Sequence, residues 1–215
     1  MRIFYGNVSG LTEQVRRDGM AFLTAERRQR VESCVREEDR RRCFGAGLLL
    51  WYGLHICGIP LDEVTVQRGR DGKPYLMGYP DFQYNLSHAG DYVAVVFDEK
   101  SVGIDIEQDS RCREQIAKRF WMPEEYAYLM EAEEQAEREE RFGRIWTRKE
   151  SYIKATGAGM RQGLDTFCVL KEQEADWHFR TYRIEEGYQI SVCSREIVTA
   201  EQPVRLDLKK ICNIP

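Results

Sequence analysis

The segment from Val102 to Glu107, Val-Gly-Ile-Asp-Ile-Glu, constrains the fold of this chain more than any other. Its apolar residues predict a buried strand, yet it also carries Asp105 and Glu107. Side chains two apart on a strand point to the same side of the sheet, so these carboxylates project together. Their burial is costly unless protons or a cation compensate the charge, and Mg2+ is the simplest compensator because it takes oxygen ligands. The alternative is a solvated strand end, and Asp-x-Glu alone does not decide between the two.

The composition is typical of a globular protein with reduced thiols. The 215 residues allow one domain or two small ones, and 42% of them are hydrophobic, which is enough for a substantial core. No stretch approaches the roughly 18 apolar residues of a membrane span, and the N-terminus lacks the pattern of a secretory signal. The seven cysteines are scattered without a Cys-x-x-Cys pair, so neither a disulfide framework nor a zinc site is indicated. We therefore expect a cytoplasmic protein.

Charge is distributed unevenly along the chain. The net charge of −4 argues against a general nucleic-acid binder. Residues 1–50 carry ten Arg and seven acidic residues, a balance of +3, whereas residues 104–150 carry nine basic and thirteen acidic residues, a balance of −4. This asymmetry is compatible with an anionic ligand in the first half and a metal ion in the second.

The order of the predicted elements divides the chain into two halves. Thr24 is a predicted N-cap for one helix, and an apolar stripe predicts a second helix over 37–54. Strands 92–97 and 102–106 are predicted to form a hairpin. Further helices are expected from 116, from 123 and over 142–155, with an acidic stretch before the last, and strands at 64–67, 82–86, 169–170, 177–184 and 188–193. Because helices precede strands twice, we predict an α+β fold with halves 1–102 and 103–215.

A second chemical motif lies in the segment Trp146-Thr-Arg-Lys-Glu-Ser-Tyr-Ile-Lys154. On a helix, Trp146, Glu150 and Lys154 are spaced by four residues and share one face. An ordinary surface Glu–Lys pair is the alternative, but the tryptophan favours a face near the core. There, Glu150 could complete a metal site or act as a base, and Lys154 could meet a phosphate.

Residues suited to binding anions occur in the first half. Ser87-His88 lies between a predicted strand and a glycine-containing turn, where binding a phosphate or nucleotide is a better interpretation than a Ser-His nucleophile. No P-loop or dinucleotide fingerprint is present. Basic residues that could meet phosphates, although each alone is compatible with a solvated surface, are Arg27, Arg30, Arg42 and Lys73.

Taken in order, these segments resemble the Sfp-type 4′-phosphopantetheinyl transferases. The resemblance covers most of the chain, and the combination and spacing of the motifs make it specific. The matching segments are Gly72-Lys73-Pro74, Asn85-Leu-Ser-His-Ala-Gly90, Gly103-Ile-Asp-Ile-Glu107 and Trp146 to Lys154. It implies two α+β halves related by a pseudo-twofold axis, and transfer of the phosphopantetheine arm of coenzyme A to a serine of an acyl or peptidyl carrier protein. We expect a monomer, because a chain with two such halves needs no partner to complete the cleft between them.

The resemblance also implies roles for individual residues. Asp105, Glu107 and Glu150 would hold Mg2+, and Lys154 would assist departure of the nucleotide. The residues expected to bind the phosphates and nucleotide of coenzyme A are Lys73, Ser87, His88, Arg27, Arg30 and Arg42.

The sequence departs from the family pattern at a few positions. Two N-terminal positions that often hold Lys hold Arg, and Cys43 stands where a hydroxyl residue is common. Two other functions stay open on the residues alone, a Mg2+-dependent nucleotide phosphohydrolase and a non-catalytic module that binds an anionic ligand.

Overall fold

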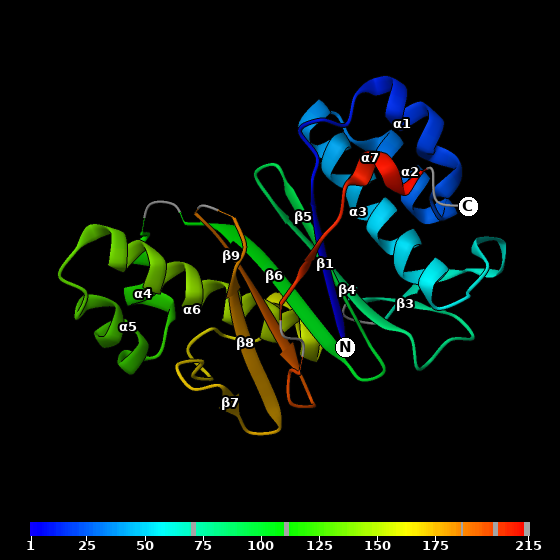
Figure 1. Cartoon of the computed structure of the whole chain (residues 1–215). Helices are drawn as coiled ribbons and strands as arrows, with labels where there is room; N and C mark the ends of the chain where they lie inside the picture. Colours follow the sequence, from blue (N-terminus) through cyan, green and yellow to red (C-terminus); the bar gives the residue numbers. More distant parts are fainter. Residues whose placement is uncertain (70–71, 110–111, 186, 200–201, 213–215) are drawn as a thin grey trace.

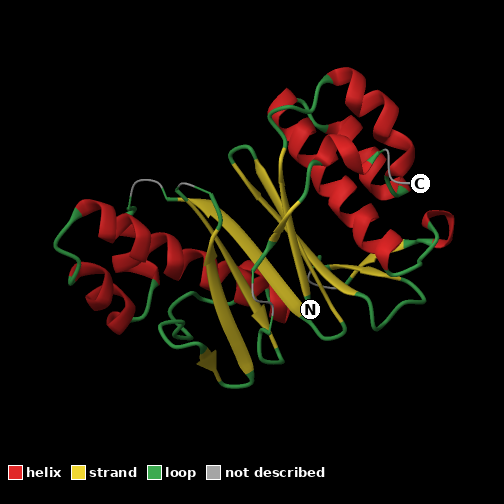
Figure 2. Ribbon diagram, in the orientation of Figure 1, coloured by secondary structure: helices red, strands yellow, loops and turns green. Residues whose placement is uncertain are grey.

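The computed structural model describes residues 1–69, 72–109, 112–185, 187–199 and 202–212. Two groups of helices lie at opposite ends of the molecule, with two sheets between them (Figures 1 and 2). Within the described ranges, no helix has the length and apolar character needed to cross a membrane.

The first half begins with a strand and ends with one. Its helices and strands are β1 (Arg2–Asn7), α1 (Glu13–Gly19), α2 (Ala25–Ser33), α3 (Glu37–Ile56), β2 (Val66–Arg68), β3 (Pro74–Leu76), β4 (Gln83–Ala89) and β5 (Tyr92–Asp98). Thr24 is the N-cap of α2, as predicted, and its side chain accepts a hydrogen bond from the backbone N–H of Arg27.

The second half starts at β6, the strand that carries the two carboxylates. Its elements are β6 (Val102–Gln108), α4 (Glu114–Phe120), α5 (Pro123–Met130), α6 (Gln135–Thr156), β7 (Gln173–Glu174), β8 (Trp177–Arg183), β9 (Tyr188–Ser194), β10 (Val204–Arg205) and α7 (Leu208–Ile211). Short 3-10 helices occupy Met20–Phe22, Leu61–Glu63 and Gly159–Arg161. The α+β class predicted from the sequence is confirmed, and the acidic stretch before residue 142 forms the first turns of α6.

Alternation along the strands builds a core in layers. One four-stranded sheet has the order β10-β1-β5-β4 and the other β6-β9-β8-β7, while β2 and β3 pair separately. On β5, Val93 and Val95 join the core around α3, whereas Ala94 and Val96 face the second sheet. Ile104 and the other inward residues of β6 and β9 fill this second interface. The sheets therefore pack face to face, each with helices on its outer side.

The predicted hairpin of strands 92–97 and 102–106 is wrong. β5 pairs with β1 and β4, whereas β6 pairs with β9. The short connection between β5 and β6 carries the chain from one sheet to the other. The two sheets pack face to face, and this packing buries the apolar faces of both strands. No strand forms at 169–170 either, since the backbone N–H of Val169 donates to the Glu125 carboxylate rather than to a neighbouring strand.

The C-terminal segment returns to the first half. β10 pairs in parallel with β1, and the α7 residues Leu208 and Ile211 belong to the core around α3. The boundary predicted between residues 102 and 103 falls one residue inside β6, and the predicted halves do not anticipate this return of the C-terminal segment.

Gly103 allows α6 to approach β6 closely, and we expect Gly103→Ala to destabilise the protein. A Cβ at this position would lie 2.0 Å from the carbonyl oxygen of Ser151 and 2.5 Å from the backbone nitrogen of Ala155. Relief of such overlap with backbone costs about 1–3 kcal/mol, which urea unfolding would measure. Gly69→Ala is the control, because its nearest contact would be an ordinary 3.7 Å. Equal stability of the two variants would contradict this packing.

Candidate active site

Asp105 lies at the centre of a polar cluster where β4, β6 and α6 meet. It points away from the interface between the sheets and is only 4% exposed. One carboxylate oxygen, Oδ1, accepts hydrogen bonds from the Ser87 hydroxyl at 2.8 Å and the Lys154 ammonium at 2.6 Å. The other oxygen, Oδ2, is buried without a hydrogen-bond partner. A buried carboxylate oxygen with no donor is costly and is suited to a ligand.

The strands β4 and β6 are held together beside this cluster by a side chain. The backbone N–H of Ile104 donates to the amide oxygen of Asn85 at 3.0 Å, although the two strands belong to different sheets. Asn85 is two residues before Ser87 and therefore faces the same way. This contact fixes Ser87 next to Asp105.

Helix α6 supplies Glu150 and Lys154 from adjacent turns, as their spacing predicted. The Lys154 ammonium also donates to the Ser87 hydroxyl at 3.0 Å and to the Ile104 carbonyl at 3.2 Å. Glu150 is half-buried, and its pKa is raised by burial and then by the charge of Asp105. Carboxylates from β6 and α6 thus influence one another across a small space.

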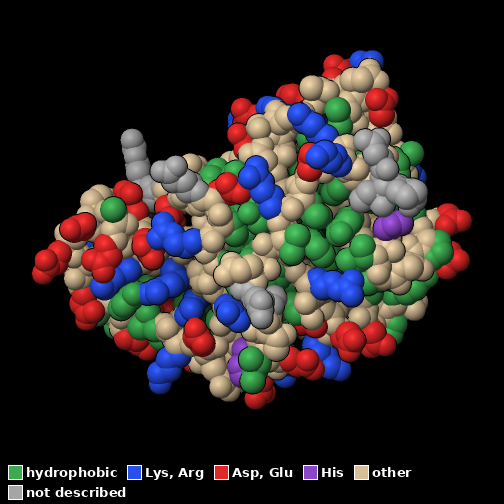
Figure 3. All heavy atoms as spheres, in the orientation of Figure 1, with side chains coloured by type: hydrophobic (Ala, Val, Ile, Leu, Met, Phe, Trp, Pro, Cys, Tyr) green, Lys and Arg blue, Asp and Glu red, His purple; other side chains and the backbone are tan. Residues whose placement is uncertain are grey.

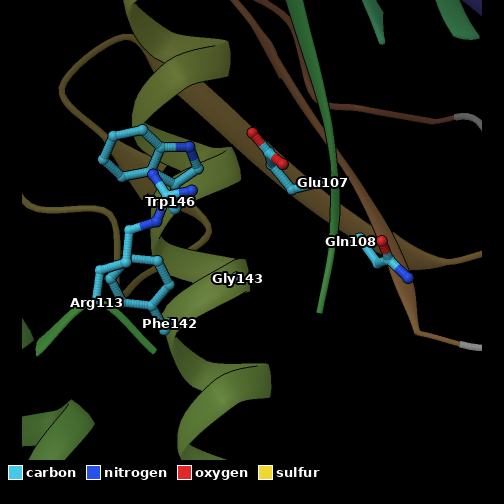
Figure 4. A pocket seen from close by; sticks show the side chains of 6 residues that line it. All are labelled: Glu107, Gln108, Arg113, Phe142, Gly143 and Trp146. Carbon is cyan, nitrogen blue, oxygen red and sulfur yellow. The ribbon is translucent and has the colours of Figure 1, made fainter. Parts of the chain in front are cut away.

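Glu107 faces a small pocket beside the cluster (Figure 4). Burial, and next the charge of Asp105, raise the pKa of Glu107 to about 7, while Lys154, Arg113 and a hydrogen bond from the Trp146 side chain oppose the rise. The lining residues, contributed by β6, α6 and the segment before α4, are Glu107, Gln108, Arg113, Phe142, Gly143 and Trp146.

The three predicted metal ligands fit a hard cation by chemistry. Among the residues described, no three acidic, His or Cys side chains are arranged to hold a metal ion, and Lys154 is the cation that contacts Asp105. However, Asp105 raises the pKa of both Glu107 and Glu150, and its own Oδ2 lacks a partner. A divalent cation, which takes oxygen ligands, would offset the repulsion among the three carboxylates and give Oδ2 a partner. The Mg2+ site stays a prediction.

The predicted anion-binding residues occupy more than one region. Ser87 belongs to the Asp105 cluster, whereas His88 is exposed on the other face of β4, with a pKa lowered by partial burial of the ring and then by Arg42. Arg42, on α3, donates to the Gly90 carbonyl at 3.0 Å and pairs with Asp39 at 2.6 Å. His88 and Arg42 therefore meet at the turn between β4 and β5.

Arg27 and Arg30 lie on α2, outside the Asp105 cluster. The Arg27 side chain is buried. Its Nε lies 3.4 Å from the Glu26 carboxylate but has no hydrogen-bond partner. Arg30 is more exposed and lines a surface pocket together with Arg68. Their expected contact with a phosphate stays a prediction.

Lys73 is held by the protein rather than left free for a phosphate. Its ammonium donates to the Ser101 hydroxyl at 3.0 Å, the Val102 carbonyl at 2.9 Å and the Ala155 carbonyl at 3.1 Å. An ammonium has three donors, so these contacts use its full capacity. They tie the turn before β3 to the start of β6 and the end of α6, and they do not favour the predicted phosphate contact.

We expect Lys73→Met to lower stability and turnover with little change in apparent substrate affinity. The substitution removes three hydrogen bonds that fix the end of α6, one residue beyond Lys154, and should cost about 1–3 kcal/mol of unfolding free energy. Urea unfolding and a separation of kcat from KM would measure this. A rise in the KM for the phosphate-bearing substrate at unchanged stability would instead identify Lys73 as a phosphate ligand.

A buried ion pair behind the site was not anticipated from the sequence. The Lys149 ammonium lies 2.7 Å from the Glu125 carboxylate, and both side chains are 0% exposed. Lys149 is four residues from Ile145 and four from Ile153, both buried, so this helical spacing was a signal, not used in the sequence analysis, that the lysine points inward. Glu125 in turn accepts from the backbone N–H of Met122 at the start of α5.

Two family models match successive segments of the chain. The family model described as "4'-phosphopantetheinyl transferase superfamily" matches residues 101–205, and the one described as "4'-phosphopantetheinyl transferase, N-terminal" matches residues 13–100. "4'-phosphopantetheinyl transferase psf-1" of Bacillus pumilus is 33% identical over 193 residues, covering 84% of this chain and 82% of that protein. "4'-phosphopantetheinyl transferase Sfp" of Bacillus subtilis (strain 168) is 31% identical over 188 residues, covering 81% and 83%.

A solved structure was also found, the holo-[acyl-carrier-protein] synthase of Thermotoga maritima. It is 19% identical with a TM-score of 0.35, covering 43% of this chain and 61% of that one. Because this likeness is low, the family assignment depends on the sequence relatives.

Proposed function

The chain belongs to the 4′-phosphopantetheinyl transferase superfamily, and we propose that it transfers the 4′-phosphopantetheine arm of coenzyme A to a serine of an apo carrier protein. The chain is accordingly an enzyme of the transferase class. The products would be a holo acyl or peptidyl carrier protein and adenosine 3′,5′-bisphosphate. The observation that carries the proposal is the cluster in which Asp105, Ser87 and Lys154 meet, with Glu107 and Glu150 beside it.

Asp105, Glu107 and Glu150 are the residues that we assign to hold Mg2+. Supporting observations are the unpartnered Oδ2 of Asp105 and the raised pKa values of the two glutamates. Bound there, Mg2+ would neutralise charge on the pyrophosphate of coenzyme A. The raised pKa of Glu150 also makes its carboxylate suited to accept the proton of the attacking serine.

Lys154 and Ser87 are placed to contact phosphate oxygens. Both are donors at the Asp105 carboxylate. The three donors of the Lys154 ammonium are taken by Ser87, Ile104 and Asp105, so a phosphate would have to replace one of these acceptors, and Asp105 would be released if its carboxylate bound a metal ion instead. The ammonium could then stabilise the negative charge that develops on the departing nucleotide. Arg42 and His88, at the turn between β4 and β5, are suited to a second phosphate or the nucleotide. We keep Arg27 and Arg30 as candidates for the 3′-phosphate, and for Lys73 we favour the structural role described above.

The carrier protein would approach near the exposed end of α4. Of the apolar run Phe120-Trp121-Met122, Phe120 is 44% exposed, whereas Trp121 is buried and stacks on Phe142. Acidic side chains gather over the helices at this end of the molecule (Figure 3). Arg119, whose guanidinium lies 5.0 Å from the centre of the Phe120 ring, is suited to meet an acidic carrier there.

A single assay separates transfer from the other candidate functions. Incubation with coenzyme A, Mg2+ and a panel of apo carrier proteins should add the mass of one phosphopantetheine arm to a carrier serine. Phosphate release without a carrier would indicate hydrolysis. If neither product formed, the chain would be a non-catalytic binding module. Either of the last two outcomes contradicts the proposal, provided that a known transferase modifies the same carriers.

The Mg2+ requirement should depend on pH through Glu107. Because the pKa of this carboxyl is about 7, a proton occupies it at lower pH and competes with the metal. The Mg2+ concentration for half-maximal rate should therefore fall as pH rises from about 6 to about 8 and then level off. Glu107→Gln should weaken this dependence and leave the part that comes from Glu150, whose pKa is also raised, and a pH-independent Mg2+ requirement in the unaltered enzyme would contradict the assignment.

A further inference from the structure

Two thiols meet where α2 is joined to α3. Cys34 follows the last residue of α2, and Cys43 lies in the second turn of α3. The Cys34 thiol lies 3.4 Å from the sulfur of Cys43 and also 3.2 Å from the carbonyl oxygen of Arg30. In the described parts of the chain, no other two cysteines are brought into such contact.

The surroundings allow the two sulfurs to close further. A disulfide bond is about 2.05 Å long, so each sulfur needs to move by less than roughly 1 Å. Cys34 is flanked by exposed residues, and Val35 beside it is 93% exposed, so the connection is not fixed by core packing. Cys43 is next to the buried Phe44, and burial followed by the nearby Cys34 raises its pKa to about 11. A small disulfide in solution therefore reaches the Cys34 thiol more readily than the Cys43 thiol.

We propose that Cys34 and Cys43 are a redox modification site, which a low-molecular-weight disulfide converts into an intramolecular disulfide between α2 and α3. The Cys34 thiolate attacks one sulfur of the small disulfide, forming a mixed disulfide and releasing the first small thiolate. Cys43 then attacks the Cys34 sulfur, and the second small thiolate leaves with the Cys43 proton. Two protein thiols are thereby oxidised to one disulfide, and one small disulfide is reduced to two thiols.

The bond would change the position of residues assigned to coenzyme A. Moving the Cys34 sulfur toward Cys43 breaks its hydrogen bond to the Arg30 carbonyl, at the end of the helix that carries Arg27 and Arg30. Arg27 and Arg30 are also close enough to Cys43 to influence its thiolate. This consequence rests on the proposed function: oxidation should raise the KM for coenzyme A about threefold or more, with kcat unchanged within about twofold.

The bond itself can be tested without any activity. The reduced full-length Cys57→Ser protein is treated with oxidised glutathione, its remaining thiols are alkylated at low pH, and tryptic peptides are weighed. Trypsin cleaves after Arg36 and Arg42, so the bond would join two separate peptides, 31–36 and 43–68. Because Cys57 shares the second peptide, its substitution makes the assignment unambiguous. The linked pair should be lighter than the two reduced peptides by two hydrogen atoms.

The Cys43→Ser variant is the matched control and should instead carry a glutathione adduct on Cys34. Separate alkylation or separate glutathione adducts on Cys34 and Cys43 would overturn the proposal, whatever the activity of the protein. A bond that forms but leaves the KM for coenzyme A unchanged would overturn its link to the substrate.

Discussion

Replacing Asp105 by Asn should lower the rate of phosphopantetheine transfer by roughly 10²–10³-fold, the loss typical when one preorganised electrostatic group is removed. The substitution keeps the shape of the side chain but removes its charge. Lys154 then loses the ionic partner that lies 2.6 Å away, and Ser87 loses an anionic acceptor. The expected result is a fall in kcat with the carrier protein as substrate, measured from the rate at which the carrier gains the mass of the phosphopantetheine arm.

A metal titration distinguishes this effect from a change in folding. Mn2+ binding, followed by electron paramagnetic resonance, should weaken in Asp105→Asn, while urea unfolding should show that the protein remains folded. Asp176→Asn is the control, because Asp176 is an exposed acid in the same half. Retained turnover and Mn2+ affinity in Asp105→Asn would rule out Asp105 as the centre of the site.

Replacing Lys149 by Met should lower the free energy of unfolding by about 3–5 kcal/mol, which is typical of leaving one partner of a buried ion pair uncompensated. The Glu125 carboxylate would lose its counter-charge, and the carbonyls of Leu164 and Phe167 would lose a donor. Burial raises the pKa of Glu125 and lowers that of Lys149, and their attraction opposes both shifts. Urea unfolding would measure the loss.

Two further variants keep this prediction testable if the single substitution prevents folding. Lys149→Met combined with Glu125→Leu removes both charges and should recover much of the lost stability. Lys171→Met, at an exposed lysine, should stay within about 0.5 kcal/mol of the unaltered protein. If Lys149→Met were as stable as Lys171→Met, the ion pair would not stabilise the fold.

Local sequence patterns predicted much of the secondary structure and the contents of the site. The N-cap at Thr24 and the apolar stripe of α3 depend on residues a few positions apart, so they are visible without a fold. The four-residue spacing of Glu150 and Lys154 likewise predicted that they share a face of α6. Asp105 and Glu107 on one strand then predicted a metal site, which Glu150 and Lys154 of this helix face would join.

Pairings between distant segments were not visible in the same way. An apolar strand such as β6 suits either a hairpin with β5 or a separate sheet, because both arrangements bury the same side chains. The contacts of Lys73 depend on the end of α6, more than 80 residues along the chain. A lysine in a turn therefore suggested a phosphate, although its ammonium binds backbone carbonyls.

The sequence by itself determined the family and the α+β class and singled out the acids that we propose for the metal site, because motif residues and helical or strand periodicity are properties of short segments. Only the tertiary structure decided that Ser87 and Lys154 converge on one oxygen of Asp105, that the other oxygen lacks a donor, and that Cys34 and Cys43 touch. The physical reason is that packing sheet on sheet, and α6 over Gly103, sets the distances between segments remote in the chain, and short-range periodicity carries no such distances.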